Sequence, residues 1–307
     1  MKQQGWEEKL EKVAGGMLKR QEPMKNYTTF RIGGAADYLI SPRSIEQIEE
    51  IAALCREYGT GCTVIGNGSN LLVSDSGVDG VILHLGNEFS KVRQEGECLL
   101  AQAGTALSAL ARKAAFLGLS GLEFASGIPG TLGGAVVMNA GAYGGEMAQV
   151  IKRVTLLSKE GERIELSGEE MQFGYRKSIV SKMGYTVLEA ELCLKEGERA
   201  VIEGQMAELN ARRREKQPLE YPSAGSTFQR PVGHFAGKLI MDAGLAGFRI
   251  GDAQVSEKHC GFVINRGNAT AKEVKELIEK IQQIVYEKTG IRLEPEVRYL
   301  CREGAGG

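Results

Sequence analysis

The sequence predicts an α+β fold with two or three domains. A chain of 307 residues is too long for one small hydrophobic core. Predicted strands and helices follow one another irregularly, which favours α+β domains over one doubly wound sheet. The 41 glycines exceed the usual share and gather in clusters, which indicates special backbone conformations or close approach of a ligand.

Helices are predicted where apolar residues recur at helical spacing. Ser44 with Gln47, and Thr270 with Glu273, have the spacing of capping boxes, and Gly290 follows the last predicted helix as its C-cap. These signals and the apolar pattern predict helices over 1–20, 44–58, 105–118, 198–217, 234–245 and 270–290.

Strands are predicted from runs of β-branched and apolar residues bounded by glycine or charged turns. Residues 62–73 are typical of a strand, a glycine loop and a second strand, and residues 150–166 of a hairpin that turns at 159–161. Further strands are expected at 80–85, 98–104, 185–197, 261–265 and 295–301.

The bulk composition excludes several classes of protein. A formal net charge of -1 gives no global field for nucleic acid or an anionic membrane. The N-terminus has no apolar core of the signal-peptide kind. The six cysteines stand singly without C-x-x-C spacing, which predicts reduced thiols in a cytoplasmic protein.

Residues 124–145, FASGIPGTLGGAVVMNAGAYGG, carry no charge and are rich in glycine. Their length would suit a membrane span, but glycine and Pro129 oppose a helix of the required length. We therefore expect a loop wrapped around a ligand.

Several common catalytic signatures are missing. GHFAGKL at 233–239 lacks the first glycine and the Ser or Thr of a phosphate-binding P-loop, and GNGSNL at 66–71 lacks the third glycine of G-x-G-x-x-G. There is no G-x-S-x-G, and three widely separated histidines with no H-E-x-x-H predict no metal site.

Two glycine-rich loops remain, IGNGSNLLV at 65–73 and SGIPGTLGGAVVMNAGAYG at 126–144. Neither contains Lys or Arg. Successive backbone N–H groups in such turns form concave sites that bind anions, so the pair would suit a long dinucleotide. Tight turns in a β-rich domain are the alternative interpretation.

These loops also carry a family resemblance. NYTTFRIGG at 26–34, both glycine-rich loops, FGYRKS at 173–178, PSAGSTFQRP at 222–231, AGKLI at 236–240, VSEKHCGFVIN at 255–265 and EPEVRYL at 294–300 occur in order. Together they resemble the UDP-N-acetylenolpyruvoylglucosamine reductases, also called UDP-N-acetylmuramate dehydrogenases. The spacing is similar to the shorter type, which lacks a tyrosine-bearing insertion.

The resemblance implies an FAD-binding region of the p-cresol methylhydroxylase and vanillyl-alcohol oxidase type over 1–217, with lobes at about 20–100 and 101–217. A substrate-binding domain would follow over 218–307, its last strand bringing Glu296 to the active site. It implies noncovalent FAD, NADPH as co-substrate, and reduction of the enolpyruvyl ether of UDP-N-acetylglucosamine to UDP-N-acetylmuramate for peptidoglycan. Nucleic acid and membrane are not expected as partners.

The resemblance also assigns roles to residues. Ser226 is similar to the family's proton donor, and Arg176 and Glu296 to its companions around the substrate carboxylate. Without the motifs, all three would be ordinary turn or surface residues. The residues expected to bind FAD are Arg31, Gly66, Asn67, Gly68, Ser69, Asn70, Gly127, Ile128, Gly130, Thr131, Gly133, Gly134, Asn139 and Gly141. Those expected to contact substrate are Tyr175, Lys216, Gln229, Arg230, Lys238 and His259.

Two positions depart from the family pattern, Asp252 where glycine is more common and Cys260 where alanine is more common. The alternatives to a reductase are an FAD-linked oxidase of the same fold that acts on an alcohol or sugar, and a nucleotide-binding module without activity. Neither glycine loop has the His or Cys that tethers flavin in many oxidases, and the Arg–Ser–Glu trio is complete.

Overall fold

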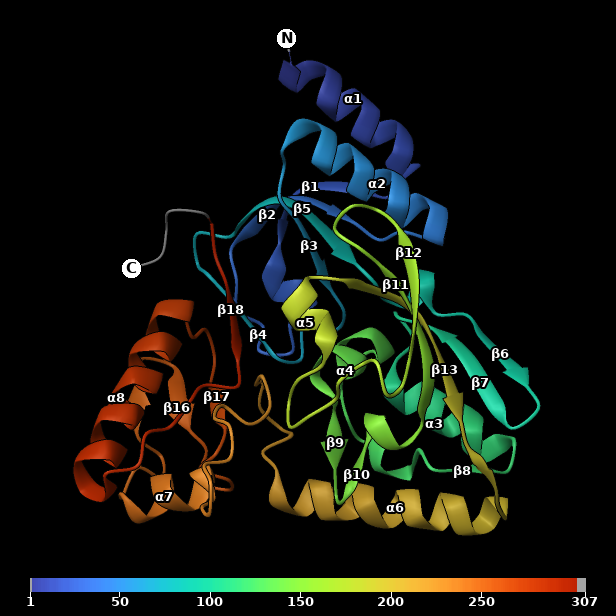
Figure 1. The fold of residues 1–307 in the computed structure, drawn as a ribbon. Coiled ribbons are helices and arrows are strands. Elements are labelled where there is room, and N and C mark those ends of the chain that lie inside the picture. The colour runs from blue at the N-terminus through green and yellow to red at the C-terminus, as the bar shows by residue number, and fades with distance from the viewer. Residues whose placement is uncertain (1, 303–307) are drawn as a thin grey trace. The chain divides into compact units, whose positions relative to one another are not determined.

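The computed structural model describes residues 2–302 and divides the chain into two compact units (Figure 1). The first unit holds the chain up to Lys19, Tyr38–Asn67 and Gly80–Arg213. The second holds Arg20–Asp37, Gly68–Asp79 and the chain from Arg214 onward. Each unit is therefore built from separate stretches of the sequence.

A five-stranded sheet, in the order β12-β11-β13-β7-β6, forms the centre of the first unit. All of its neighbouring strands pair antiparallel. The predicted hairpin is confirmed as β11 and β12, and the strand expected at 185–197 is β13. The bounds are β6 Val92–Glu95, β7 Cys98–Gln102, β11 Ile151–Leu157, β12 Arg163–Ser167 and β13 Thr186–Cys193.

The long helices of the first unit lie where they are predicted, but the helix predicted over 1–20 ends at Ala14, and residues 18–20 belong to strand β1. Helix α1 (Lys2–Ala14) packs on α2 (Ile45–Tyr58), as Figure 1 shows. Ser44 caps α2 by accepting the Gln47 N–H, but the Gln47 side chain accepts from the Arg43 N–H, so the expected box is incomplete. The other two are α3 (Leu107–Phe116) and α6 (Arg199–Lys216).

A second sheet has the order β1-β2-β5-β3. Its strands are β1 Leu18–Pro23, β2 Ala35–Ile40, β5 Val78–His84 and β3 Cys62–Ile65, and β3 runs parallel to β5. The chain passes from one unit to the other within β1, β2 and β5. The short elements of the first unit are β8 Leu119–Ser120, β9 Gly141–Ala142, β10 Gly145–Glu146, β14 Lys195–Glu196 and α5 Ile179–Met183.

The glycine-rich stretch contains a helix that the sequence does not predict. Helix α4 (Leu132–Met138) begins at Thr131, whose side chain accepts the Gly134 N–H, and ends at Asn139 in a left-handed conformation. Leu132 and Val136 are buried in the core, and Gly133 lies so close to Ala103 that a Cβ atom would approach its side chain to 2.9 Å. Packing therefore stabilises a helix that propensity disfavours.

The prediction that all six cysteines are reduced is wrong at two positions. Cys98 on β7 and Cys193 on β13 face one another in the antiparallel register and form a disulfide. They are 95 residues apart in sequence, so spacing could not reveal their proximity. The free thiols are Cys55, Cys62, Cys260 and Cys301.

The second unit has its own hydrophobic core, in which Phe30, Ile240, Val255 and Ile281 are buried. Helix α8 has the predicted Thr270–Glu273 capping box and ends at Gly290. The last strand, β18, pairs parallel with β4, and β15-β16-β17 form a small sheet. The bounds are β4 Leu71–Val73, α7 Ala236–Asp242, β15 Arg249–Ile250, β16 Ala253–Val255, β17 Val263–Asn265, α8 Ala271–Thr289 and β18 Arg298–Leu300.

Among residues 2–302, no helix has both the length and the apolar character needed to cross a membrane. The uncharged stretch 124–145 is accounted for by short helices, turns and β9 of the first unit.

Candidate active site

In the first unit, the start of one glycine-rich loop lies against the other. A Cβ atom at Gly66 would lie 2.2 Å from Thr131 Oγ1, so only glycine allows this approach. The Asn67 side chain donates to the Pro129 carbonyl over 3.0 Å. Two segments far apart in sequence therefore form one backbone surface around Thr131.

The backbone donors of this surface divide into used and unused groups. Leu132 N–H donates to Thr105, Gly133 N–H to Ala103, and Gly134 N–H to Thr131 Oγ1. Thr131 itself is 2% exposed, yet its N–H has no hydrogen-bond partner among the described residues.

A buried backbone N–H without a partner is rare, because it loses its hydrogen bond to water and gains nothing in return. The Thr131 N–H lies where Gly66 packs against Thr131, and an anionic group of a nucleotide would accept its hydrogen bond. This observation is compatible with the predicted binding of a dinucleotide such as FAD by the loop. Gly133 and Gly134 would contact such a ligand through atoms other than N–H.

A cation that the sequence analysis did not assign lies beside the same loop. Arg213, in the last turn of α6, packs against Gly127: a Cβ atom there would lie 3.1 Å from Arg213 Cδ and 3.4 Å from one guanidinium nitrogen. Asn210, one turn earlier, donates to Ser126 Oγ over 3.1 Å. Burial lowers the pKa of Arg213.

The neighbouring cation behaves differently. Arg212 is exposed and forms an ion pair with Glu208 on the same helix, whereas no carboxylate within residues 2–302 pairs with Arg213. In the sequence, Arg212, Arg213 and Arg214 look alike. The helical phase that places Arg213 over Asn210 and the loop is the signal that could have distinguished it.

Arg176 occupies a tight turn of the first unit. Gly174 and Lys177 exchange two backbone hydrogen bonds of 3.0 and 3.2 Å, which leaves Tyr175 and Arg176 at the tip. Arg176 has φ +55°, a value that glycine or asparagine normally supplies at this turn position. Such a conformation costs about 1–3 kcal/mol for other residues. The guanidinium lies 5.3 Å from the centre of the exposed Tyr175 ring.

In the second unit, the structure brings Ser226 and Glu296 together. Thr227, the next residue after Ser226, accepts the Glu296 N–H over 2.8 Å, and the Gln229 N–H donates to Glu294 over 2.8 Å. Ser226 is exposed although Ala224, Thr227 and Phe228 are buried. The two predicted catalytic side chains of this unit therefore stand on adjacent extended segments.

The remainder of the first glycine-rich loop also supports Glu296. Asn70 donates from its side chain to the Glu296 carbonyl over 3.0 Å, and its own carbonyl accepts the Arg298 N–H over 3.0 Å. Gly68, which has φ +59°, packs against the Tyr27 carbonyl, where a Cβ atom would clash. Ser69 is half-buried between these two residues. Asn70, itself a predicted FAD residue, is thus hydrogen-bonded to the predicted catalytic residue Glu296.

The motif at 26–34 supports the segment that carries Ser226. Thr29 Oγ1 donates to the Ser223 carbonyl over 2.7 Å, and Asn265 donates from its side chain to the Phe30 carbonyl over 3.2 Å. Arg31, a predicted FAD residue, has φ +55° in this motif. The motif therefore has a structural role in this unit, and its contact with FAD stays a prediction.

The residues predicted to contact substrate differ in exposure. Lys216, Gln229 and Arg230 are exposed, and Lys238 is exposed but ion-paired with Asp242 at 2.9 Å. Burial lowers the pKa of His259, whose Nδ1 accepts the Gly261 N–H over 3.1 Å. Because Nδ1 acts as an acceptor, Nε2 is the ring nitrogen left to donate a hydrogen bond.

Two other predicted FAD residues have evident packing roles. Ile128 packs against the core of the first unit, and Gly141 lies so close to the Gly145 carbonyl that a Cβ atom would approach it to 2.6 Å. Cys260, a departure from the family pattern, is buried in the core of the second unit.

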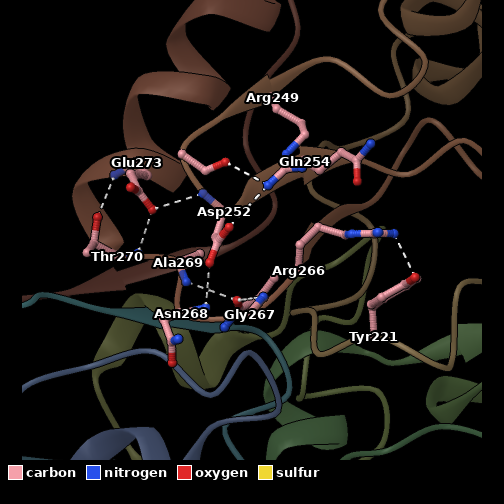
Figure 2. Close-up of polar contacts among 12 residues, drawn as sticks. Tyr221, Arg249, Asp252, Gln254, Arg266, Gly267, Asn268, Ala269, Thr270 and Glu273 are labelled. Carbon is pink, nitrogen blue, oxygen red and sulfur yellow. Dashed lines mark hydrogen bonds and ion pairs between the residues drawn. The ribbon is translucent and has the colours of Figure 1, made fainter.

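Asp252, the other departure, belongs to a network at the start of α8 (Figure 2). Its carboxylate accepts the Asn268 N–H over 2.9 Å and a guanidinium N–H of Arg249 over 3.1 Å. Its backbone N–H donates to Glu273 over 3.4 Å. Asp252 therefore links the β15–β16 turn to the loop before α8. Its hydrogen bonds in this network hold the two loops together.

Comparison with known proteins agrees with these features. The model of the UDP-N-acetylenolpyruvoylglucosamine reductase C-terminal domain matches residues 217–300, and an FAD binding domain model matches residues 36–167. The predicted α+β, FAD-binding fold is confirmed by these matches and by the solved structure described next.

Full-length relatives extend the match over nearly the whole chain. The chain is 52% identical to a UDP-N-acetylenolpyruvoylglucosamine reductase of Lachnoclostridium phytofermentans, covering 91% of each protein. It is 51% identical to one of Clostridioides difficile, covering 92% of this chain and 93% of the relative. The crystal structure of the Thermus caldophilus reductase superposes with a TM-score of 0.79 at 39% identity, covering 92% of this chain and 98% of that one.

Proposed function

The chain belongs to the UDP-N-acetylenolpyruvoylglucosamine reductase family, and on this basis we propose that it reduces the enolpyruvyl ether of UDP-N-acetylglucosamine to UDP-N-acetylmuramate. It is an FAD-dependent oxidoreductase with NADPH as co-substrate. The observation that carries the proposal is identity of about half over nine-tenths of the chain to named reductases. The product is a precursor of peptidoglycan.

We assign FAD binding in the first unit to the surface formed by Gly66, Asn67 and residues 127–131. The unused Thr131 N–H would donate to a phosphate oxygen of the pyrophosphate, and the Arg213 guanidinium would balance its charge. Bound FAD supplies hydride transfer from NADPH to the alkene carbon. The absence of Lys and Arg from both loops is compatible with this role because backbone donors and α6 provide the polarity.

The substrate alkene is conjugated to a carboxylate, so hydride addition builds negative charge on that group. A preplaced cation lowers the barrier by stabilising this charge, and we propose Arg176 for the role. Ser226 would donate its hydroxyl proton to the carbon beside the carboxylate. Glu296, held next to the Ser226 segment, would hydrogen-bond the same region.

Serine is a weak acid, so proton donation requires neighbours that stabilise its alkoxide. The hydrogen bond from the Glu296 N–H to the Thr227 carbonyl fixes the backbone that carries the Ser226 and Glu296 side chains. This preorganisation supports Ser226 as donor because little reorganisation is then needed during the reaction.

Tyr175, Lys216, Gln229, Arg230, Lys238 and His259 remain proposed substrate contacts. The proposed small-molecule partners are the UDP-sugar enolpyruvyl ether and NADPH. We expect neither nucleic acid nor a membrane as a partner, and we propose that the protein acts in the cytoplasm. An FAD-linked oxidase acting on an alcohol or sugar is the second candidate, and it has less support from the named relatives.

Two spectroscopic experiments test the proposal. The purified protein should show a flavin spectrum or acquire one with FAD. Under anaerobic conditions, NADPH should bleach the flavin, and the enolpyruvyl UDP-sugar should restore its colour with formation of UDP-N-acetylmuramate. Restoration by oxygen alone, with no reaction of the UDP-sugar, would favour the oxidase.

A further inference from the structure

We propose that Asn139 and Ser178 are positioning residues that hold Arg176 in place by tying its turn to helix α4 of the glycine-rich loop. This inference rests on the proposed role of Arg176. It concerns only residues of the first unit, which the structure places relative to one another.

Two hydrogen bonds join the Arg176 turn to the C-terminal end of α4. The Asn139 side-chain amide donates to the Gly174 carbonyl over 3.2 Å, and Ser178 Oγ donates to the Val137 carbonyl over 2.9 Å. Gly174 begins the turn and Ser178 follows it, so Arg176 is anchored on both sides.

Both anchors are buried, with Asn139 2% and Ser178 6% exposed. The Asn139 side chain is also fixed from its other side, since its Oδ1 atom accepts the Ala148 N–H over 2.9 Å. Its φ of +42° ends α4, a conformation that asparagine tolerates better than most residues. The side chain is therefore held in one orientation by contacts inside the protein.

The turn needs such anchoring because Arg176 adopts a strained backbone conformation. A residue at positive φ keeps that conformation only when its surroundings enforce it. The hydrogen bonds of Asn139 and Ser178 provide that enforcement at the two ends of the turn.

Helix α4 links the two anchors to the proposed cofactor surface. It begins at Thr131, the residue with the unused backbone donor, and ends at Asn139. One helix of seven residues thus connects the proposed cofactor surface to the proposed catalytic cation. Its rigidity would set the position of Arg176 with respect to the cofactor.

The sharpest variant is Asn139→Asp. It keeps an oxygen for the Ala148 N–H but replaces the donor to the Gly174 carbonyl by an acceptor, which cannot bond to it. Asn139→Gly removes both bonds while permitting positive φ, and Ser178→Ala removes the second anchor. Ser158→Ala is the matched control, because Ser158 is 5% exposed and its Oγ accepts backbone N–H groups in the β11–β12 turn.

We expect the anchor variants to slow flavin reoxidation by the enolpyruvyl UDP-sugar by about 10- to 100-fold, the loss typical of a displaced catalytic group. Substrate binding to the oxidised enzyme should weaken, whereas in Ser178→Ala, which changes no residue expected to bind FAD, FAD affinity and flavin reduction by NADPH should stay within about twofold. Ser158→Ala should leave all four quantities unchanged while lowering thermal stability.

A double-mutant cycle with Arg176→Ala decides whether the anchors act through Arg176. In that background Asn139→Asp should slow reoxidation by no more than about twofold further. A full additional loss there, or loss of FAD affinity in Ser178→Ala, would overturn the inference. Failure of the wild-type flavin to react with the UDP-sugar would instead overturn the proposed function, and this inference with it.

Discussion

The backbone N–H of Glu296 donates to the carbonyl of Thr227 over 2.8 Å, although the two residues come from opposite ends of the second unit's C-terminal segment. Phe228 and Pro295 form an antiparallel bridge one residue further on. The exposed Ser226 and the Glu296 side chain therefore lie on two short segments that pair antiparallel. Whether the two residues act together in catalysis can be tested by mutation.

Removing the Ser226 hydroxyl should separate the two half-reactions. We expect Ser226→Ala to keep flavin reduction by NADPH and to slow reoxidation by the UDP-sugar by several orders of magnitude, because proton delivery is lost. Anaerobic stopped-flow absorbance measures both steps. Ser223→Ala is the control, since Ser223 accepts the hydrogen bond from Thr29 Oγ1 through its backbone carbonyl, which the substitution keeps. Near-normal turnover of Ser226→Ala would remove serine from the mechanism.

Arg213 should contribute to FAD affinity, and Arg212 should not. A charge-assisted hydrogen bond contributes about 1.5–3 kcal/mol, so Arg213→Ala should weaken FAD binding by about 10- to 100-fold. Flavin fluorescence titration of the apoprotein gives the dissociation constants. Arg212→Ala is matched in helix, charge and length, and it should bind FAD like the wild type. Equal constants for both variants would argue that α6 has no part in the cofactor site.

Acid should weaken the first unit through Glu191. Hydrogen bonds from Lys152 and then Arg153 lower the pKa of this buried carboxyl from its usual 4.5. The stabilisation is therefore full above pH 4.5 and is lost as the pH falls through the lower, folded-state pKa. Glu191→Gln should cost about 1–2 kcal/mol of unfolding free energy at neutral pH and reduce the loss below pH 4.5.

Urea unfolding between pH 3 and pH 7 provides the measurement for Glu191→Gln. The control is Glu165→Gln, because Glu165 also pairs with Arg153, at 3.3 Å, but its side chain is 59% exposed. Exposed pairs contribute little, so this variant should follow the wild-type curve. An identical pH dependence for Glu191→Gln and the wild type would contradict the assignment.

Reduction of the Cys98–Cys193 disulfide should lower the free energy of unfolding by about 2–4 kcal/mol, because the bond closes a long loop in the unfolded chain. Unfolding with and without reductant measures the difference. Thiol labelling of the denatured protein should modify Cys55, Cys62, Cys260 and Cys301 before reduction, and Cys98 and Cys193 only afterwards. Labelling of all six at the start would disprove the bond.

Local signals in the sequence predicted much of the fold. The Thr270–Glu273 box and Gly290 marked both ends of α8, and the turn at 159–161 marked the β11–β12 hairpin. Helix α4 was missed because its support is tertiary: Val136 is buried and Gly133 packs on Ala103. Propensity at a glycine-rich segment carries no information about such neighbours.

The candidate site was also predicted only in part. Motifs pointed to Ser226, Glu296 and Arg176, but they could not show that the Asn139 side chain is occupied by Gly174 and Ala148. They also gave no reason to prefer Arg213 over its two neighbours. Both depend on helix phase and on contacts between distant segments, which a linear pattern does not encode.

The pairing of β4 with β18 has a consequence for synthesis of the protein. Leu71–Val73 leave the ribosome well before their partner Arg298–Leu300 is translated. During most of translation the backbone groups of β4 that will bond to β18 must remain hydrated or be covered by another molecule. The second unit can therefore complete its folding only after β18 has been translated, and ribosome-bound nascent chains that lack β18 should be protease-sensitive at residues 68–79.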